Sequence, residues 1–295
     1  MTPRSVLVLG ATGKVGRNVV AGLLEAGLAV RALVRSPRPG GLPPQAAVHR
    51  GDVHDPASVA AAAEGADAAF LLWPGFSADG AAPAVAALAR HVGQIVHLSA
   101  GRIDPEGGGV TSGVWAEVEE LVRAAGVPAT FLRPGGFAGN TLMWAADIRA
   151  GRPVRTPTPE AGRSLIHERD IADVAVLALC DPGRHAGQAH LLTGPAILTE
   201  REQAAAIGDA AGRSVAVETE TRAEATARLI AGGGDPAWVA QALDYWESLV
   251  ERPEVAVDTV ERLTGHPARP FSRWARDHAD AFRAPSTTGV TDARG

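Results

Sequence analysis

Three residue types that carry much of protein chemistry are nearly absent from this sequence. Its 295 residues include one cysteine, Cys180, one tyrosine, Tyr245, and one lysine, Lys14. A single cysteine excludes a disulfide framework and a cysteine-rich metal site, so we expect the chain in the reducing cytoplasm. The histidines lack the spacing of metal ligands, and no metal is therefore predicted.

Excess positive charge and long apolar runs are also missing. The formal net charge is −5, which predicts no basic surface for nucleic acid or anionic lipid. No run approaches the roughly 20 apolar residues of a membrane span, and no secretory signal precedes the first strand. With 46% hydrophobic and 21% charged residues, the composition indicates one elaborated globular domain or a domain with a smaller companion.

Short apolar runs alternate with helical stretches through the first half of the chain. Helical patterns include 14–26 and 114–125, and Asp55 followed by Pro56 starts another helix. Because parallel strands need helical crossovers, this alternation predicts an α/β fold with a doubly wound parallel sheet (Rossmann) covered on both faces. The predicted strands are six runs, at 6–10, 29–34, 46–51, 68–73, 94–99 and 128–134.

After about residue 140 the alternation loosens and helices dominate. Asp170 is predicted as the N-cap of a helix over 170–180. A second helix is predicted from Thr199, with Glu202 at the spacing of a capping box, and a third from Asp235.

We therefore predict three segments. Residues 1–140 form the Rossmann core, whose sheet is completed by part of 164–195. Residues 141–283 form a smaller, mainly helical C-terminal substrate lobe interleaved with the core, and 284–295 form a flexible tail.

The stretch GATGKVG places three glycines, Gly10, Gly13 and Gly16, between a strand and a helix. In that context the spacing is typical of a dinucleotide-binding turn. Gly10 permits the tight turn, Gly13 lets the backbone approach a pyrophosphate, and Gly16 lets helix and strand pack closely. The alternative is a plain turn between strand and helix.

The end of the second strand lacks the carboxylate that usually binds the adenosine ribose. Arg35, Ser36 and Arg38 stand there instead, which favours the 2′-phosphate of NADP(H) over NAD(H). Lys14 could add positive charge to this region. A solvated loop is the alternative for the two arginines, and Asp52 could cap either the adenine end or its own turn.

Several stretches together resemble the NmrA-like group of atypical short-chain dehydrogenases/reductases. The resemblance implies a Rossmann domain, a small C-terminal substrate lobe and usually NADP(H); some members reduce quinones or ketones, and others bind the cofactor as redox sensors. The stretches are GATGKVG, VRALVRSP, RGDVHDPASV, AAFLLWP, IVHLSA, EVEELVRAAGVPATFLRPGGFAGN and HERDIADVA.

The resemblance also implies which residues bind the ligands. Asn140 is expected to face the substrate. The expected cofactor contacts are Gly10, Thr12, Gly13, Val15, Gly16, Arg35, Asp52, Val53, Trp73, Ser99, Pro134, Gly135, Gly136 and Phe137.

The chain departs from this family at the acid catalyst. Short-chain reductases ordinarily use a tyrosine with a lysine four residues later, but Tyr245 is followed by Trp-Glu-Ser-Leu. NmrA-like reductases often carry His or Lys four residues before the equivalent of Glu119, where this chain has Trp115. An ordinary acid catalyst is therefore not predicted.

Two hydroxyl groups are the catalytic candidates. Ser99, at the end of the fifth predicted strand, could donate a hydrogen bond to a carbonyl, or it could simply cap the strand. Tyr245 is a possible proton donor from a lid helix. The predicted substrate contacts are Asn140 and four tryptophans that could stack on an aromatic ring system or simply lie in the core, namely Trp115, Trp144, Trp238 and Trp246.

Because no ordinary acid catalyst is predicted, we expect the substrate to be an acceptor that delocalises negative charge. We therefore predict an NADPH-dependent reductase that transfers hydride to a carbonyl of a quinone or an aromatic polyketide-like molecule. An NADP(H) redox sensor without turnover is the alternative, and an isomerase or dehydratase that retains its cofactor is a third hypothesis. The protein is expected to be a monomer or a homodimer.

Overall fold

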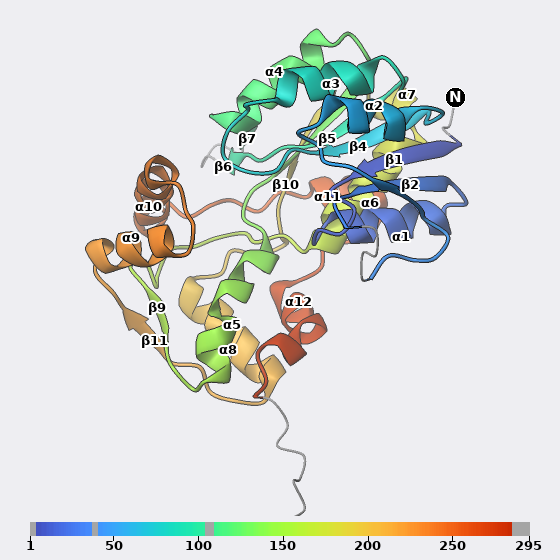
Figure 1. Ribbon diagram of the computed structural model, residues 1–295. Coiled ribbons are helices and arrows are strands. Elements are labelled where there is room, and N and C mark those ends of the chain that lie inside the picture. The colour runs from blue at the N-terminus through green and yellow to red at the C-terminus, as the bar shows by residue number, and fades with distance from the viewer. Residues whose placement is uncertain (1–3, 37–40, 104–108, 285–295) are drawn as a thin grey trace, which may run out of the picture.

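A single sheet of seven parallel strands organises the computed structural model, which describes residues 4–36, 41–103 and 109–284. The strand order β10-β8-β5-β4-β1-β2-β3 is that of a doubly wound fold (Figure 1). This confirms the predicted fold class and the six predicted strands. The strands are β1 (Ser5–Leu9), β2 (Ala29–Val34), β3 (Ala47–Arg50), β4 (Ala68–Leu72), β5 (Ile95–Leu98), β8 (Ala129–Pro134) and β10 (Ala189–Leu192).

Helices cover both faces of the sheet, as its apolar strands require. On one face, α1 (Gly16–Glu25) packs against α6 (Glu168–Cys180), and α11 (Thr259–Thr264) packs beside α6. On the other face lie α2 (Pro56–Ala63), α3 (Ala81–Ala89) and α4 (Val114–Ala124). Each face has its own apolar core, with Val19 and Val174 in one and Val59 and Val118 in the other.

The C-terminal region is mainly helical and lies beside the carboxyl ends of the strands (Figure 1). Its core surrounds the fully buried Trp274. A separate small cluster joins α9 to α10 through Ala225, Val239 and Leu243. The elements are η1 (Ala138–Trp144), α5 (Ala145–Arg149), β9 (Val154–Thr156), α8 (Glu200–Ala211), β11 (Val217–Thr219), α9 (Arg222–Ala231), α10 (Pro236–Glu251), α12 (Phe271–Asp277) and η2 (Ala279–Ala281).

The remaining elements are short connections. A small antiparallel pair formed by β6 (Arg102–Ile103) and β7 (Gly109–Val110) precedes α4, and α7 (Pro182–His185) leads into β10. The predicted tail at 284–295 lies, apart from its first residue, outside the described residues. Within the described ranges, no helix is both long and apolar enough to cross a membrane.

Local capping signals identified three helix starts correctly. The Asp55 carboxylate accepts a hydrogen bond from the Ala57 amide at 3.0 Å. Thr199 and Glu202 form the predicted capping box, and Asp235 caps α10 through the Trp238 amide at 2.9 Å. These caps are local, so they can be recognised without knowing the fold.

The predicted start of the helix at Asp170 is wrong. The helix α6 begins at Glu168, and the side chain of His167 accepts the capping hydrogen bond from the Arg169 amide. Asp170 instead accepts a hydrogen bond from the Arg269 amide at 2.8 Å and pairs with the Arg269 guanidinium. Asp170 therefore makes a tertiary contact with a residue almost one hundred positions later in the chain. The local sequence pattern does not reveal this contact.

Candidate cofactor and active site

The first turn has the geometry that its glycines predict. Gly10 adopts φ +78°, and the Gly13 amide donates to the Gly10 carbonyl at 2.9 Å. A Cβ atom at Gly16 would lie 2.1 Å from the Gly10 oxygen, so only glycine fits there. The N-cap residue of α1, Val15, makes no side-chain capping bond. This turn and the helix N-terminus therefore fit a pyrophosphate.

The end of β2 presents a cation and a hydroxyl to solvent. Arg35 and Ser36 directly follow the strand, and both are exposed; Arg38 lies outside the described residues. Asp52 caps its own turn, because its carboxylate accepts from the His54 amide at 3.0 Å. Val53 is partly buried against the neighbouring core.

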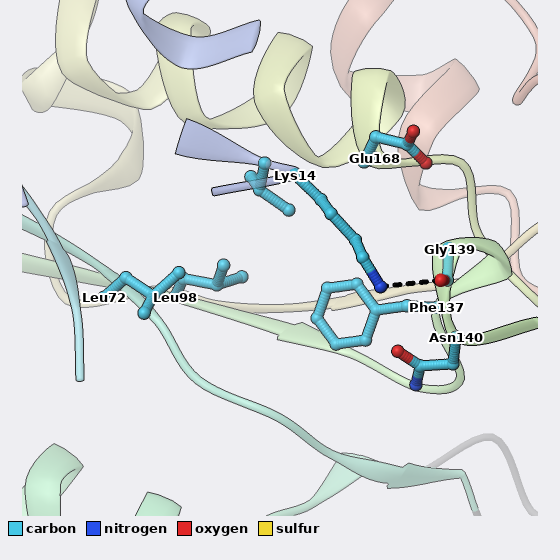
Figure 2. Close-up of a pocket in the computed structure, with 8 residues that line it drawn as sticks. Lys14, Leu72, Leu98, Phe137, Gly139, Asn140 and Glu168 are labelled. Atoms are coloured by element: carbon cyan, nitrogen blue, oxygen red, sulfur yellow. Dashed lines mark hydrogen bonds between the residues drawn. The ribbon is translucent and has the colours of Figure 1, made fainter. Parts of the chain in front are cut away.

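A cavity of about 230 Å³ lies at the carboxyl ends of β4 and β5, next to the N-termini of α1 and α6 (Figure 2). In open α/β sheets this edge is where ligands bind. It brings together four residues that the sequence predicts, Lys14, Val15, Phe137 and Asn140, with four that it does not, Leu72, Leu98, Gly139 and Glu168.

Of the missed residues, Leu72 and Leu98 could have been found. Each is the last residue of a parallel strand, and the two strands are adjacent in the sheet. Ligand-facing residues gather at such strand ends. Gly139 and Glu168 carry no comparable local signal, because a turn and a tertiary contact place them at the cavity.

Lys14 crosses the cavity instead of pointing along the helix. Its Nζ donates to the Gly139 carbonyl at 2.6 Å, past the ring of Phe137 (Figure 2). The residue remains exposed, but burial of its ammonium lowers its pKa, and the negative charge of Glu168 partly opposes that effect. Lys14 thus contacts the turn after β8, and its expected contribution of charge near Arg35 stays a prediction.

Glu168 forms the α6 side of the cavity and is tied to the C-terminal segment. Its Oε1 lies 2.8 Å from His278 Nε2, while Oε2 is buried without a hydrogen-bond partner among the described residues. Burial raises its pKa, but hydrogen bonds from His278 and from its own backbone amide outweigh that effect and lower it. Glu168 is therefore a carboxylate.

His278 carries two protons in this arrangement. Its Nδ1 lies 2.9 Å from the Trp274 carbonyl oxygen, which only accepts, and its Nε2 faces the carboxylate of Glu168. The hydrogen bond to Glu168 raises the pKa of His278 despite desolvation. An imidazolium thus stands behind the carboxylate at the cavity wall.

Ser99 is buried at the end of β5 beside an ionic network. Glu119, with no exposed surface, pairs with Arg133 and Arg123 at 2.6 Å each. Burial raises the pKa of Glu119, but hydrogen bonds from Arg133, Ser99 and Arg123 lower it below its ordinary value. The Ser99 hydroxyl lies 3.5 Å from the hydroxyl of Thr111.

Tyr245 faces a second buried carboxylate. Its hydroxyl donates to Glu254 at 2.8 Å. Glu254 also accepts from the Ser164 amide at 2.8 Å and pairs with Arg163 at 3.3 Å. The hydroxyl proton of Tyr245 is thus directed to a carboxylate, whereas the hydroxyl of Ser99 lies near that of Thr111.

The predicted turn after β8 is built against the second half of the chain. The Gly135 amide donates to Leu192 of β10, and the Gly136 carbonyl accepts from Ile166 at 2.8 Å. A Cβ at Gly136 would lie 2.3 Å from the Leu165 side chain. The turn at Gly136 therefore packs closely against the side chains of Leu165 and Arg163, which precede α6.

The tryptophans occupy separate surroundings. Trp73 is 7% exposed and donates from its indole nitrogen to Ser77 at 2.8 Å. Trp144 is buried in the C-terminal core, and Trp115 packs against the core beneath α4.

On α10, Trp238 contacts Trp246 edge to face at 6.4 Å between ring centroids. Trp238 also contacts Phe76, with the centroids 4.8 Å apart. Phe76 lies in the segment between β4 and α3. This pair connects α10 to the sheet domain near the end of β4.

Comparison with known proteins agrees with this geometry. A family model described as NAD(P)H-binding matches residues 10–182. The chain is 37% identical over 284 residues to the (4-alkanoyl-5-oxo-2,5-dihydrofuran-3-yl)methyl phosphate reductase of Streptomyces griseus, covering 94% of this chain and 99% of that protein. It is 36% identical over 286 residues to the NAD(P)H azoreductase of Xenophilus azovorans, covering 95% and 99%.

Two solved structures share the fold along almost their whole length. An NADPH-dependent quinone oxidoreductase from Escherichia coli superposes with a TM-score of 0.74 at 21% identity, covering 92% of this chain and 98% of that one. The triphenylmethane reductase of Citrobacter sp. complexed with NADP(H) gives 0.73 at 20% identity, covering 93% and 99%.

The chain belongs to the NAD(P)H-binding family. It is an NAD(P)H-dependent oxidoreductase. A solved structure of an NmrA variant shares its fold with a TM-score of 0.69 at 18% identity, covering 96% of this chain and 97% of that one.

Proposed function

We propose that this protein is an NADPH-dependent reductase whose substrate is a conjugated acceptor, such as a quinone or an aromatic polyketide-like carbonyl compound. The observation that carries the proposal is the cavity at the carboxyl ends of β4 and β5, which adjoins the glycine turn and contains a single ammonium group. When bound, the cofactor supplies a hydride. The protein must orient the acceptor, exclude water and deliver a proton.

The proposed cofactor contacts are those that the sequence predicts. The turn from Gly10 to Gly16 holds the pyrophosphate, and the turn from Pro134 to Phe137 lies against the nicotinamide end. Arg35 and Ser36 bind the 2′-phosphate, because they are exposed at the end of β2 and face solvent. Gly16 supports this assignment, since a side chain there would press into the backbone of Gly10 and distort the turn.

The preference for a conjugated acceptor follows from charge. An isolated ketone gives a strongly basic alkoxide, whereas a quinone gives a phenolate-like oxygen with a pKa of about 10, which demands much less from an acid. The names of the relatives support the same class, because an azo group, a quinone and an oxo-dihydrofuran are conjugated acceptors. Trp238 and Trp246 are proposed to contact the ring system of the substrate.

A catalytic role for Ser99 or Tyr245 stays a prediction. The Tyr245 hydroxyl would first have to leave Glu254, the carboxylate to which it donates. If Ser99 is a donor to the substrate, Ser99→Ala should lower turnover more than it weakens cofactor binding.

The function is tested by the loss of nicotinamide absorbance with NADPH or NADH against quinones, conjugated ketones and simple ketones. We expect turnover with NADPH and the first two classes, and its loss in Gly13→Trp, whose indole would occupy the pyrophosphate position. Turnover with simple ketones alone would contradict the proposed substrate class. Unequal binding of the two cofactor forms without turnover would indicate a redox sensor instead.

The cofactor preference has its own test in Arg35→Ala. We expect the affinity for NADPH, measured by calorimetry, to fall about tenfold or more, because a charge-assisted contact to phosphate is lost, while the affinity for NADH stays unchanged. Arg90→Ala, at the exposed end of α3, is the matched control. An equal loss of affinity for both cofactors would contradict the role of Arg35.

A further inference from the structure

Reduction of a carbonyl needs a proton as well as a hydride, and the cavity offers few sources. Of the eight described residues that line it, Lys14 and Glu168 are the two that ionise, and Glu168 is a carboxylate. Ser99 and Tyr245 are not among these lining residues, and the Tyr245 hydroxyl donates to Glu254. The proton donor that the cavity itself contains is therefore the ammonium of Lys14.

We propose that Lys14 is a catalytic residue and that its ammonium delivers the proton that completes reduction in this cavity. The inference rests on the proposed reductase function. When hydride adds to the carbonyl carbon, the π electron pair of the C=O bond moves to the oxygen. That oxygen takes a proton from Nζ, Lys14 becomes a neutral amine, and solvent restores its proton.

The position of Nζ supports this role. Its hydrogen bond to the Gly139 carbonyl, at 2.6 Å, uses one of its three protons and fixes the side chain across the cavity. Asn140, the next residue in the chain, lines the same cavity with a side-chain amide that can orient a polar acceptor. A donor held in this way loses little rotamer entropy on reaction.

The charges around Lys14 suit an acid that must act near neutral pH. Desolvation lowers the pKa of Lys14, which makes its proton easier to transfer, while the carboxylate of Glu168 limits the effect and keeps the group charged. Glu168 is in turn held by the imidazolium of His278. Glu168 and His278 act on the reaction through Lys14, so they are positioning residues.

Because Lys14 is the sole lysine, its ionisation can be measured directly. Protein labelled with ¹³C at the lysine ε-carbon gives one ε signal, whose titration reports the pKa of Lys14. We expect a value below the ordinary value of about 10.4 and a further decrease in Glu168→Gln, because the carboxylate that favours the ammonium is lost. A wild-type pKa at or above the ordinary value, or no decrease in Glu168→Gln, would overturn the proposal.

Turnover tests the chemistry independently. Lys14→Met should lower kcat with a quinone about 100-fold, the scale of general acid catalysis, while calorimetry shows a much smaller change in NADPH affinity. Lys14→Arg should also be slow, because guanidinium keeps the charge but does not give up its proton. A wild-type rate in Lys14→Arg would show that charge alone suffices and would overturn proton donation.

The two proposals fail in different ways. If the wild-type protein reduces quinones and Lys14→Met does so at an undiminished rate, the reductase assignment stands and Lys14 is not the donor. If Lys14→Met lowers NADPH affinity and leaves kcat unchanged, Lys14 is a cofactor contact only. If the wild-type protein reduces no acceptor while binding NADPH, the reductase assignment fails and the role of Lys14 fails with it.

Discussion

At the scale of single residues, the ionic network around Glu119 is expected to contribute strongly to the free energy of unfolding. The carboxylate has no exposed surface, and it joins Arg123 of α4 to Arg133 of β8. Removing one member of a buried ion pair leaves the other charge without compensation, which costs more than the pair itself gains.

We therefore expect Glu119→Leu to lower the free energy of unfolding by about 3 kcal/mol, as measured by urea denaturation. Arg123 is the matched control, because its side chain is 48% exposed. Arg123→Ala should cost no more than about 1 kcal/mol. Equal losses in the two variants would show that the burial of Glu119 is not the source of its contribution.

His97 makes stability depend on pH. It is fully buried in β5, its Nδ1 donates to the Leu71 carbonyl, and burial lowers its pKa to about 4. Between about pH 6.5 and about pH 4 the unfolded chain binds a proton that the folded chain does not, so stability falls as the pH falls, by about 3 kcal/mol in all.

The test compares wild type with His97→Gln, which keeps a donor for Leu71 and cannot titrate. The variant should lose less stability than wild type on acidification, as measured by urea denaturation at several pH values. Parallel curves would contradict this assignment, because His185 and His190, whose pKa values are also lowered, titrate in both proteins.

What the sequence predicts about individual residues depends on how local their role is. The roles of Gly10, Gly13 and Gly16 follow from their spacing in one turn, and the structure has that turn. The partners of side chains cannot be predicted in this way, because Lys14 donates a hydrogen bond to Gly139, which lies 125 positions later in the chain. No local pattern contains that information.

At the scale of elements, the junction between β1 and α1 is the most constrained. A Cβ at Gly16 would press into the backbone of Gly10, whereas a Cβ at Gly93 would meet the Asp67 carbonyl at an ordinary 3.6 Å. We expect Gly16→Ala to cost about 2 kcal/mol through overpacking and to weaken NADPH binding, because α1 must move.

The control, Gly93→Ala, should change the free energy of unfolding by less than about 1 kcal/mol, since no strain accompanies it. Denaturant titrations and calorimetry would measure both properties. If Gly16→Ala kept full stability and affinity, the close approach of α1 to β1 would not be what the glycine serves.

Most elements could be predicted from the sequence, because apolar periodicity and capping residues are local. The start of α6 could not be predicted, because Asp170 has the residue type of an N-cap but accepts a hydrogen bond from the Arg269 amide instead. The short 3-10 segment Ala138–Trp144 also lacks a clear periodic pattern. The fold was thus predictable where propensity and tertiary contacts agree, and it was not where they compete.

At the scale of the whole molecule, the later part of the chain is bound into the sheet domain. Arg269 pairs with Asp170 and Asp173 of α6, and β10 lies at the edge of the sheet beside β8. The division into a core and a substrate lobe stays a prediction. These contacts indicate that the later part of the chain and the sheet domain stabilise each other.

We therefore expect one cooperative unfolding transition. Urea curves recorded by far-ultraviolet circular dichroism and by tryptophan fluorescence should superimpose, because Trp274 is fully buried in a segment tied to α6 through Arg269. Arg269→Ala should separate the two curves or lower both midpoints. A fluorescence transition that precedes loss of helical signal in wild type would show independent unfolding of the later region.

The pairing of Glu168 with His278 also bears on the order of synthesis. A nascent chain can form every strand of the sheet once β10 has emerged from the ribosome, yet the residue that holds Glu168 comes more than eighty residues later. A prematurely terminated product that lacks this last segment would keep the glycine turn but not the finished wall opposite it. Formation of this cavity wall is thereby linked to the synthesis of α12 and of the residue that follows it.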